Sequence, residues 1–292
     1  MRDHSDLDDT VNEVRRIVRD ALRLTSMHAH VARFAPSVDG GKMLRARLLL
    51  GVGAPAGVPR PVLCQAAAAV EMLHAASLLH DDIVDGGTRR RGMPALWVSE
   101  GTRAAVLLGD LLVSLAGKAV QESLPSQLPM MVSTLHEMCD AQAEQEFAGP
   151  DADASWAHCV GIARRKTGAL FGFAAACAGG PQPERVAALR RAGYALGTAY
   201  QLADDLLDAS PSPLTDDKSL GTDSATGKLT AANMFPGEDV DPKSAIASLL
   251  QESEDELARW PEVQQAWREY VRDFVAPLVA QFAGSAVVQA IA

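Results

Sequence analysis

The sequence predicts an all-α fold in one domain, and three observations lead to this prediction. Apolar residues make up 48% of the 292 positions and aromatic residues only 5%, with alanine and leucine dominating over β-branched runs. Alanine and leucine favour helices, whereas β-branched and aromatic residues favour strands. Neither a linker rich in glycine, serine or proline nor a series of alternating strands interrupts the chain. We therefore expect residues 1–292 to form a single bundle of about ten or more helices.

Each predicted helix is an apolar segment of helical period that is bounded by proline or glycine. Such breaks occur at 36–41, at the Pro/Gly-rich stretch 51–61, and at Gly86-Gly87 directly after a long apolar segment. The segment 210–228, with several prolines and glycines, is expected to form an exposed loop or lid. The helices are predicted at 7–24, from 43 onward, 62–84, 104–121, 130–147, 155–178, 184–208, 242–259 and 262–282.

Charge and cysteine content limit the classes of function. A net charge of −10 argues against a nucleic-acid partner, which needs a basic face. The four cysteines form no C-x-x-C pair, so we expect reduced thiols and a cytoplasmic location. The first 16 residues are charged and lack the apolar core of a signal peptide. The apolar stretches 104–116 and 170–178 are short or interrupted by Asp110, so no transmembrane segment is expected.

One acidic pentapeptide occurs twice, as Asp81-Asp82-Ile83-Val84-Asp85 and as Asp204-Asp205-Leu206-Leu207-Asp208, each at the end of an apolar helical segment. On a helix the first and fifth positions lie one turn apart on the same face. Acidic pairs on helices usually belong to a solvated face, but carboxylates crowded beside apolar walls repel one another unless a cation neutralises them. Carboxylate oxygens suit Mg²⁺, which also binds substrate phosphates. The two copies therefore predict a magnesium site around a diphosphate.

Basic residues occur in short groups near the two pentapeptides and could bind the remaining negative charge of a diphosphate. Arginine offers a planar fork for bidentate phosphate contact, and lysine offers a point charge. Any one group alone is more typical of a solvated surface. The groups are Gly40-Gly41-Lys42-Met43-Leu44-Arg45, Arg89-Arg90-Arg91-Gly92, Arg164-Arg165-Lys166-Thr167, and the single residues Lys218 and Lys228.

These motifs together resemble those of the trans-isoprenyl diphosphate synthases, the polyprenyl synthetase family that includes farnesyl and geranylgeranyl diphosphate synthases. Asp81 to Asp85 followed by Arg90-Arg91-Gly92-Met93-Pro94 is similar to the family's first motif, DDxxDxxxxRRGxP, and the segment from Gln201 to Asp208 is similar to the second. The resemblance extends over residues 40–230, about two thirds of the chain. It implies an isoprenoid-synthase bundle around a central cavity, a homodimer, and a Mg²⁺-dependent condensation of isopentenyl diphosphate with an allylic diphosphate.

The resemblance also implies roles for individual residues. The principal ligands of three Mg²⁺ ions would be Asp81, Asp85 and Asp204, with Asp208 as a further metal residue and with Asp82 and Asp205 supporting metal, water or cation contacts. The allylic diphosphate would be bound by Arg90, Lys166, Lys218 and Lys228. The isopentenyl diphosphate would be bound by Lys42, Arg45, His74 and Arg91. Thr167 and Gln201 would lie near the reacting carbons, where an oxygen dipole stabilises positive charge.

Two small residues, Ala76 and Ser77, lie four and five positions before Asp81, where the family's bulky aromatics stop chain growth near the farnesyl stage. The resemblance therefore implies a product of C20 or longer. The sequence departs from the family's GGKRxRP pattern at Met43 and Ala46, and Asp217 stands before Lys218 in place of the common glycine.

Two other functions are compatible with parts of this pattern. A class I terpene cyclase would ionise the same allylic substrate, but it has no use for the second diphosphate pocket that Lys42, Arg45, His74 and Arg91 would form. A non-catalytic partner subunit of a heteromeric prenyltransferase need not keep two complete aspartate motifs. The sequence therefore favours the elongating synthase.

Overall fold

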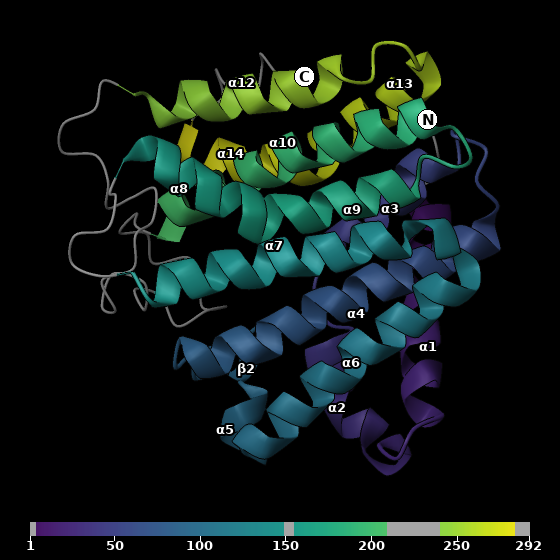
Figure 1. Cartoon of the computed structure of the whole chain (residues 1–292), viewed down its shortest axis with the longest axis vertical. Helices are drawn as coiled ribbons and strands as arrows, with labels where there is room; N and C mark the ends of the chain where they lie inside the picture. Colours follow the sequence, from purple (N-terminus) through teal and green to yellow (C-terminus); the bar gives the residue numbers. More distant parts are fainter. Residues whose placement is uncertain (1–3, 149–154, 209–239, 284–292) are drawn as a thin grey trace.

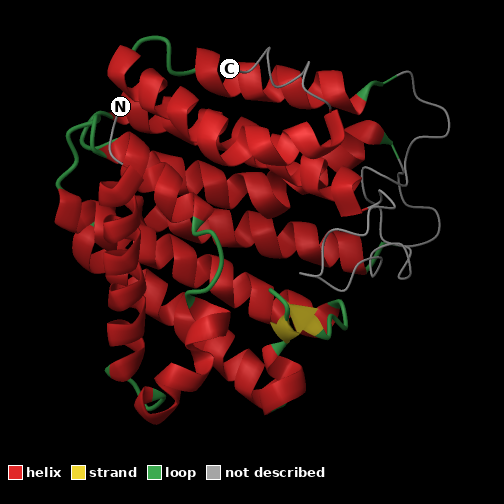
Figure 2. Ribbon diagram, turned by 180° about the vertical axis from the view of Figure 1, so that it is seen from behind, coloured by secondary structure: helices red, strands yellow, loops and turns green. Residues whose placement is uncertain are grey.

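The computed structural model is a bundle of helices, which confirms the predicted all-α class (Figure 1; Figure 2). The structure describes residues 4–148, 155–208 and 240–283. Within these residues the only strands are two-residue strands, β1 (Arg89–Arg90) and β2 (Met93–Pro94), which pair antiparallel. They form the small yellow hairpin in Figure 2 and hold the arginine-rich loop that follows the first aspartate pentapeptide.

The described residues form the helices of the bundle. In chain order they are α1 (His4–Arg23), α2 (Val31–Val38), α3 (Leu44–Gly53), α4 (Arg60–Val84), α5 (Leu96–Glu100), α6 (Thr102–Ser123), α7 (Leu128–Glu146), α8 (Trp156–Ala163), α9 (Ala169–Cys177), α10 (Pro183–Asp208), α12 (Pro242–Asp255), α13 (Pro261–Tyr270) and α14 (Ala276–Ala283). Short 3₁₀ turns occupy His28–His30 and Pro125–Gln127, and π-helical turns occupy Arg164–Gly168 and Val271–Val275.

The structure corrects several predicted boundaries. Helix α2 includes Pro36, where a break was predicted because proline removes a donor and crowds the preceding turn; the helix ends two residues later. Helix α5 was not predicted, since its five residues are too few to show a period. The segment predicted as one helix over 155–178 is α8, a π-helical turn and α9.

Close packing in the bundle depends on small residues. The run Ala66 to Ala69 in the middle of α4 is buried and packs beside neighbouring helices. A Cβ atom added at Gly193 of α10 would lie 2.5 Å from the carbonyl oxygen of Phe171 in α9. One added at Gly197 would lie 2.8 Å from the Cα atom of Gly168. The α9 and α10 backbones therefore touch, which fixes the second aspartate pentapeptide relative to the turn that precedes α9.

Two helices are longer and more apolar than the sequence reasoning allowed. By length and composition alone, α4 and α6 are each long and apolar enough to cross a membrane, so the expected absence of a transmembrane segment stays a prediction. Helix α4 reaches this hydropathy because it lies in the core, where 72% of its apolar window is buried. In α6 only 33% of the window is buried, and Val106 and Leu107 are exposed. The apolar character of α6 is therefore not explained by packing within this chain.

Candidate active site

A cavity of about 780 Å³ is lined by residues of α4, α7 and α10, among others. These three helices finish at the same end of the bundle (Figure 1). This volume is in the usual range for ligand pockets. All predicted site residues whose side chains the structure describes line this one cavity: Lys42, Arg45, His74, Ala76, Ser77, Asp81, Asp82, Asp85, Arg90, Arg91, Lys166, Thr167, Gln201, Asp204 and Asp205. The predicted lid at 210–228, with Asp217, Lys218 and Lys228, and the side chain of Asp208 lie outside the described part of the chain.

The first aspartate pentapeptide ends α4. Asp85 occupies the C-cap, where its backbone N–H donates to the carbonyl oxygen of Asp81 at 2.8 Å. Burial raises the pKa of Asp81, and the neighbouring carboxylates of Asp85 and Asp82 add to this effect, while the cation of Lys166 opposes it. Asp82 is itself buried and accepts from the guanidinium of Arg90, at 2.9 Å from Nε and also from Nη2. Asp82 therefore ties α4 to the hairpin.

The second pentapeptide belongs to a relay of side-chain hydrogen bonds. The hydroxyl of Thr167 donates to Oε1 of Gln201 at 2.6 Å, and Nε2 of Gln201 donates to Oδ1 of Asp205 at 2.6 Å. Thr167 lies in the π-helical turn before α9, a kind of turn that is frequent at functional sites. In the same turn the ammonium of Lys166 donates to Oε1 of Gln145 at 3.1 Å. The turn thus presents a cation and a hydroxyl to the cavity side by side.

The donor set of the two pentapeptides fits a hard divalent cation. Among the described residues, no three His, Cys, Asp or Glu side chains are close enough to form a closed metal site. Mg²⁺ does not need such a cage, because it usually takes one or two carboxylates and completes its shell with water and substrate phosphates. A cation would also relieve the mutual repulsion of the carboxylates around Asp81. The residues present therefore suit metal ions that are held jointly with an anionic ligand.

The opposite part of the cavity is basic. The guanidinium of Arg45 lies 4.5 Å from the ring centroid of Phe171, and its buried Nε has no hydrogen-bond partner among the described residues. Burial lowers the pKa of Arg45, and the nearby carboxylate of Glu71 opposes this shift. Burial, followed by the charges of Arg45 and Arg91, holds the pKa of His74 well below its usual range. His74 is therefore neutral and could donate a hydrogen bond to an anion without adding charge.

The remaining basic residues of the predicted groups have other partners. Arg89 donates to the carbonyl oxygen of Gly92 at 2.7 Å and closes the hairpin. Arg165 pairs with Asp140 and Glu144 of α7, and the guanidinium of Arg164 lies over the ring of Tyr194. Lys166 is thus the member of its group that lines the cavity.

Sequence reasoning missed several cavity residues, above all Glu71, which is buried and accepts from the backbone N–H of Ala46 at 2.8 Å. A signal for it was present, because positions 71, 74, 78, 81 and 85 follow the three-then-four spacing of one helix face. The others give no such pattern. They include Gln142, Gln145, Cys159 and Tyr200. All four cysteines are free, and burial raises the pKa of the Cys159 thiol to about 12.

Comparison with solved structures defines the class of fold. The chain superposes on a polyprenyl synthase from Caulobacter crescentus, crystallised with calcium and isoprenyl diphosphate, with a TM-score of 0.71 and 27% sequence identity. The superposition covers 97% of this chain and 92% of that one. The bundle therefore has the isoprenoid-synthase architecture that the sequence predicted.

The sequence comparisons identify the family. Residues 31–266 match the model of the polyprenyl synthetase family. A short chain isoprenyl diphosphate synthase from Methanothermobacter thermautotrophicus is 36% identical over 65% of this chain and 61% of its own length. A nonaprenyl diphosphate synthase from Mycobacterium tuberculosis is 31% identical over 78% of this chain and 68% of its own length. The chain therefore belongs to the polyprenyl synthetase family, and its matches span about two thirds of these relatives.

Proposed function

We propose that this protein condenses isopentenyl diphosphate with an allylic diphosphate, head to tail and in the trans geometry, to give a linear polyprenyl diphosphate and free diphosphate. The observation that carries the proposal is the single cavity lined by carboxylates of both aspartate pentapeptides and by the basic residues of the 40–45 loop and the hairpin. Membership of the polyprenyl synthetase family supports it. A cavity lined by both charged and apolar side chains suits a ligand with a diphosphate head and a hydrocarbon tail.

Divalent cations, which we take to be three Mg²⁺ ions, would stabilise the charge of the leaving diphosphate. Asp81, Asp85 and Asp204 would hold them, with Asp208 as a further ligand, because these positions supply hard oxygen donors from the two pentapeptides. The calcium in the related Caulobacter crescentus structure supports a divalent site in this family.

In the proposed reaction the C1–O bond of the allylic diphosphate breaks, and its electron pair leaves with the diphosphate. Lys166, with Arg90, would donate charge-assisted hydrogen bonds to that leaving group. The double bond of isopentenyl diphosphate then forms the new bond to C1, and a proton lost from the isopentenyl unit to the released diphosphate restores a double bond. The oxygens of Thr167 and Gln201, already fixed by their mutual hydrogen bond, would face the positive charge without attacking it.

Isopentenyl diphosphate would bind at the basic part of the cavity. Lys42, Arg45 and Arg91 line this part and supply cations, and the neutral His74 supplies a hydrogen-bond donor. The buried Nε of Arg45, which has no hydrogen-bond partner among the described residues, supports this assignment. A buried donor without a partner lowers stability unless a ligand accepts its hydrogen bond.

We infer a product of C20 or longer from two small residues in the cavity wall. Ala76 and Ser77 both line it, and Ala76 is almost fully buried, so a larger side chain there would occupy ligand space. Ala76→Tyr should shorten the product to about the farnesyl stage by filling that space, with product length read by mass spectrometry. Ala32→Tyr, at an exposed position of α2, is the matched control and should leave product length unchanged. Equal products from both variants would contradict this assignment.

One incubation tests the reaction against its alternatives. The purified protein is incubated with Mg²⁺, labelled isopentenyl diphosphate and, separately, dimethylallyl, geranyl or farnesyl diphosphate, and the products are resolved by mass. Elongated linear diphosphates support the proposal. Diphosphate release with cyclic hydrocarbons would instead identify a class I terpene cyclase, and turnover only with a second protein would identify a partner subunit.

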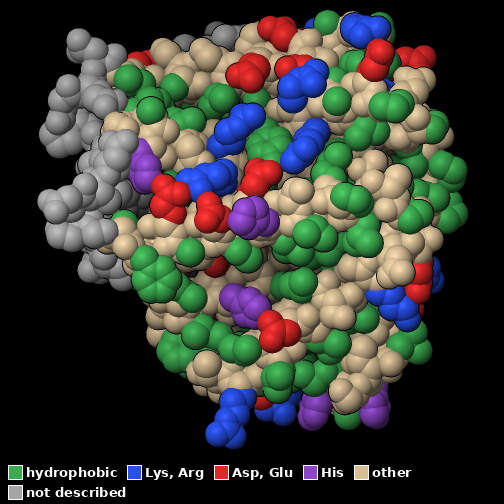
Figure 3. All heavy atoms as spheres, viewed as in Figure 1, with side chains coloured by type: hydrophobic (Ala, Val, Ile, Leu, Met, Phe, Trp, Pro, Cys, Tyr) green, Lys and Arg blue, Asp and Glu red, His purple; other side chains and the backbone are tan. Residues whose placement is uncertain are grey.

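We also propose a homodimer, formed through the outer face of α6. On the face shown in Figure 3, hydrophobic side chains gather over α6 and α7. Val106 and Leu107 of α6 and Val132 of α7 are exposed, although α6 is apolar enough for a core helix. Light scattering should give twice the chain mass for the wild type, and Leu107→Asp should shift it toward the monomer. A monomeric wild-type protein would contradict the proposal.

A further inference from the structure

The loop at 39–43 has a backbone shape that its own residues do not stabilise. It connects α2 to α3 and brings Gly41, Lys42 and Met43 to the cavity wall. Gly41 has φ +84° and Met43 has φ +51°, both in the left-handed region that is unfavourable for a residue such as methionine. Surrounding contacts must therefore hold the loop in this shape.

The side chain of Arg91 lies directly against this loop. A Cβ atom added at Gly41 would be 2.8 Å from Nε of Arg91, and one added at Gly40 would be 3.0 Å from its Nη1. Nη1 of Arg91 also lies 3.5 Å from the carbonyl oxygen of Pro36 in α2. A displacement of the loop would therefore displace Arg91, and with it a cation of the basic part of the cavity.

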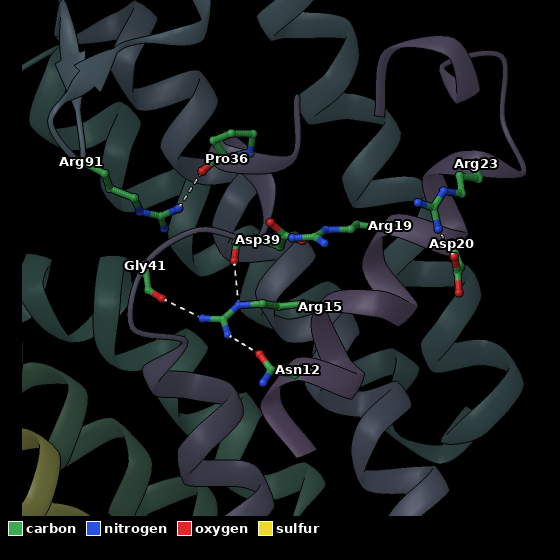
Figure 4. A network of polar contacts seen from close by, with 9 residues as sticks. All are labelled: Asn12, Arg15, Arg19, Asp20, Arg23, Pro36, Asp39, Gly41 and Arg91. Atoms are coloured by element: carbon green, nitrogen blue, oxygen red, sulfur yellow. Dashed lines mark hydrogen bonds and ion pairs between the residues drawn. The ribbon is translucent and has the colours of Figure 1, made fainter. Parts of the chain in front are cut away.

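Helix α1 holds the loop from its outer side (Figure 4). Nε of Arg15 donates to the carbonyl oxygen of Asp39 at 3.1 Å, and Nη2 donates to that of Gly41 at 3.1 Å. The carboxylate of Asp39 is buried and forms an ion pair with Arg19. The third nitrogen of Arg15 donates to Asn12 at 2.9 Å, which fixes the guanidinium on the helix. One arginine fork thus binds two carbonyls of the loop and sets the distance between them.

We propose that Arg15, with the Asp39–Arg19 ion pair, is a positioning unit that shapes the isopentenyl diphosphate pocket. None of these three residues lines the cavity, so they act through the loop and through Arg91 and not by touching substrate. The aspartates of the cavity lie on α4 and α10 and not on the loop that this unit holds. The inference rests on the proposed function, because it assigns the basic part of the cavity to isopentenyl diphosphate.

Steady-state kinetics with both substrates tests the unit. Arg15→Ala should raise KM for isopentenyl diphosphate about tenfold, while KM for the allylic diphosphate and kcat stay within about twofold. Arg15→Lys should recover part of the affinity, because its ammonium can still bind one of the two carbonyls. Recovery should be incomplete, because lysine lacks the planar fork that binds both. Asp39→Asn keeps the shape of the side chain and should give a smaller rise in the same KM.

Arg23→Ala is the matched control, since Arg23 lies on the same helix and, in the part of the chain that the structure describes, pairs with the exposed Asp20 (Figure 4). It should leave both KM values unchanged. Equal rises in both KM values, or Arg15→Ala kinetics that match Arg23→Ala, would overturn the positioning role. If the wild type did not elongate at all, the proposed function would be contradicted. The positioning role would then be tested by measuring the affinity for isopentenyl diphosphate with calorimetry. Binding that is weaker in Arg15→Ala than in the wild type supports the role, and equal binding overturns it.

Discussion

The two aspartate pentapeptides carry acids at the same positions but are supported differently. In the first, the middle carboxylate of Asp82 is buried and paired with Arg90, so it joins a helix to the hairpin. In the second, the middle carboxylate of Asp205 is partly exposed and ends a relay from Thr167 through Gln201. Of the outer acids, Asp81 and Asp85 of the first copy and Asp204 of the second line one cavity. The same acidic position is therefore paired with an arginine in one copy and with a glutamine amide in the other.

The outer acids should give the largest effect and should not differ between the copies. Asp81→Ala and Asp204→Ala each remove a proposed metal ligand and should lower kcat by about 10³-fold or more, since charge stabilisation at the leaving group is worth several kcal/mol. Formation of elongated diphosphate measures this loss. Asp20→Asn, at an exposed position of α1, is the control. If either variant kept near-wild-type turnover, its pentapeptide would not hold metal.

The middle acids should differ in stability. Asp82→Asn removes the negative charge that pairs with the Arg90 guanidinium, and both side chains are largely buried. The free energy of unfolding should therefore fall by about 2–3 kcal/mol. Asp205→Asn should cost less than about 1 kcal/mol, because its carboxylate reaches solvent and a side-chain amide can still accept from Gln201. Urea unfolding of both variants measures the difference. Equal losses would remove the structural distinction between the two copies.

The relay of the second copy should affect catalysis more than folding. Thr167→Val keeps the shape of the side chain but removes the hydroxyl that holds Gln201, and kcat should fall about tenfold. Thr134→Val is the matched control, since the buried Thr134 hydroxyl has no hydrogen-bond partner among the described residues and Thr134 does not line the cavity. That control should be neutral or stabilising. A Thr167→Val enzyme with wild-type kcat would exclude a role for the relay in the reaction.

The smallest effect concerns acid stability at the basic part of the cavity. The pKa of His74 is lowered in the folded protein, so below the ordinary histidine pKa near 6.5 the unfolded chain binds a proton that the native protein does not. Stability is therefore present above that pH and is lost as pH falls. Between pH 7.5 and 5.5 the wild type should lose about 1 kcal/mol more than His74→Gln in denaturant titrations. Equal losses of stability in the two proteins would mean that the pKa of His74 is not lowered in the folded protein.

The fold class and most of the candidate site could be predicted from the sequence, because both depend on local patterns. The helical period places Asp81 and Asp85 one turn apart, and motif order places Arg90 and Lys166 beside them. Their convergence on one cavity followed from the family resemblance, which the family match confirms. Their chemical roles, the single-domain organisation and the location in the cell remain predictions.

The rest could not be predicted, because it depends on contacts between distant segments. Arg15 and Asp39 are 24 residues apart and share no motif. The left-handed backbone of Met43 and Arg91 has no sequence signal, since such conformations usually occur at glycine. Helix α2 contradicts the local rule for proline, and its apolar residues Val31, Phe34 and Val38 pack into the core strongly enough to override that rule.

The π-helical turn over Arg164–Gly168 has a consequence for how this chain could change in length. Such a turn holds one residue more than a regular α-helical turn, and each residue of an α-helix advances the direction of its side chain by about 100°. Deleting a single residue there would give an unbroken α-helix from α8 to α9 with the buried faces of both still aligned, but it would remove the widened turn that presents Lys166 and Thr167 to the cavity side by side. Lys166 or Thr167 would then leave the cavity. Protein engineers should therefore treat this turn as a fixed length, and should place insertions and deletions elsewhere.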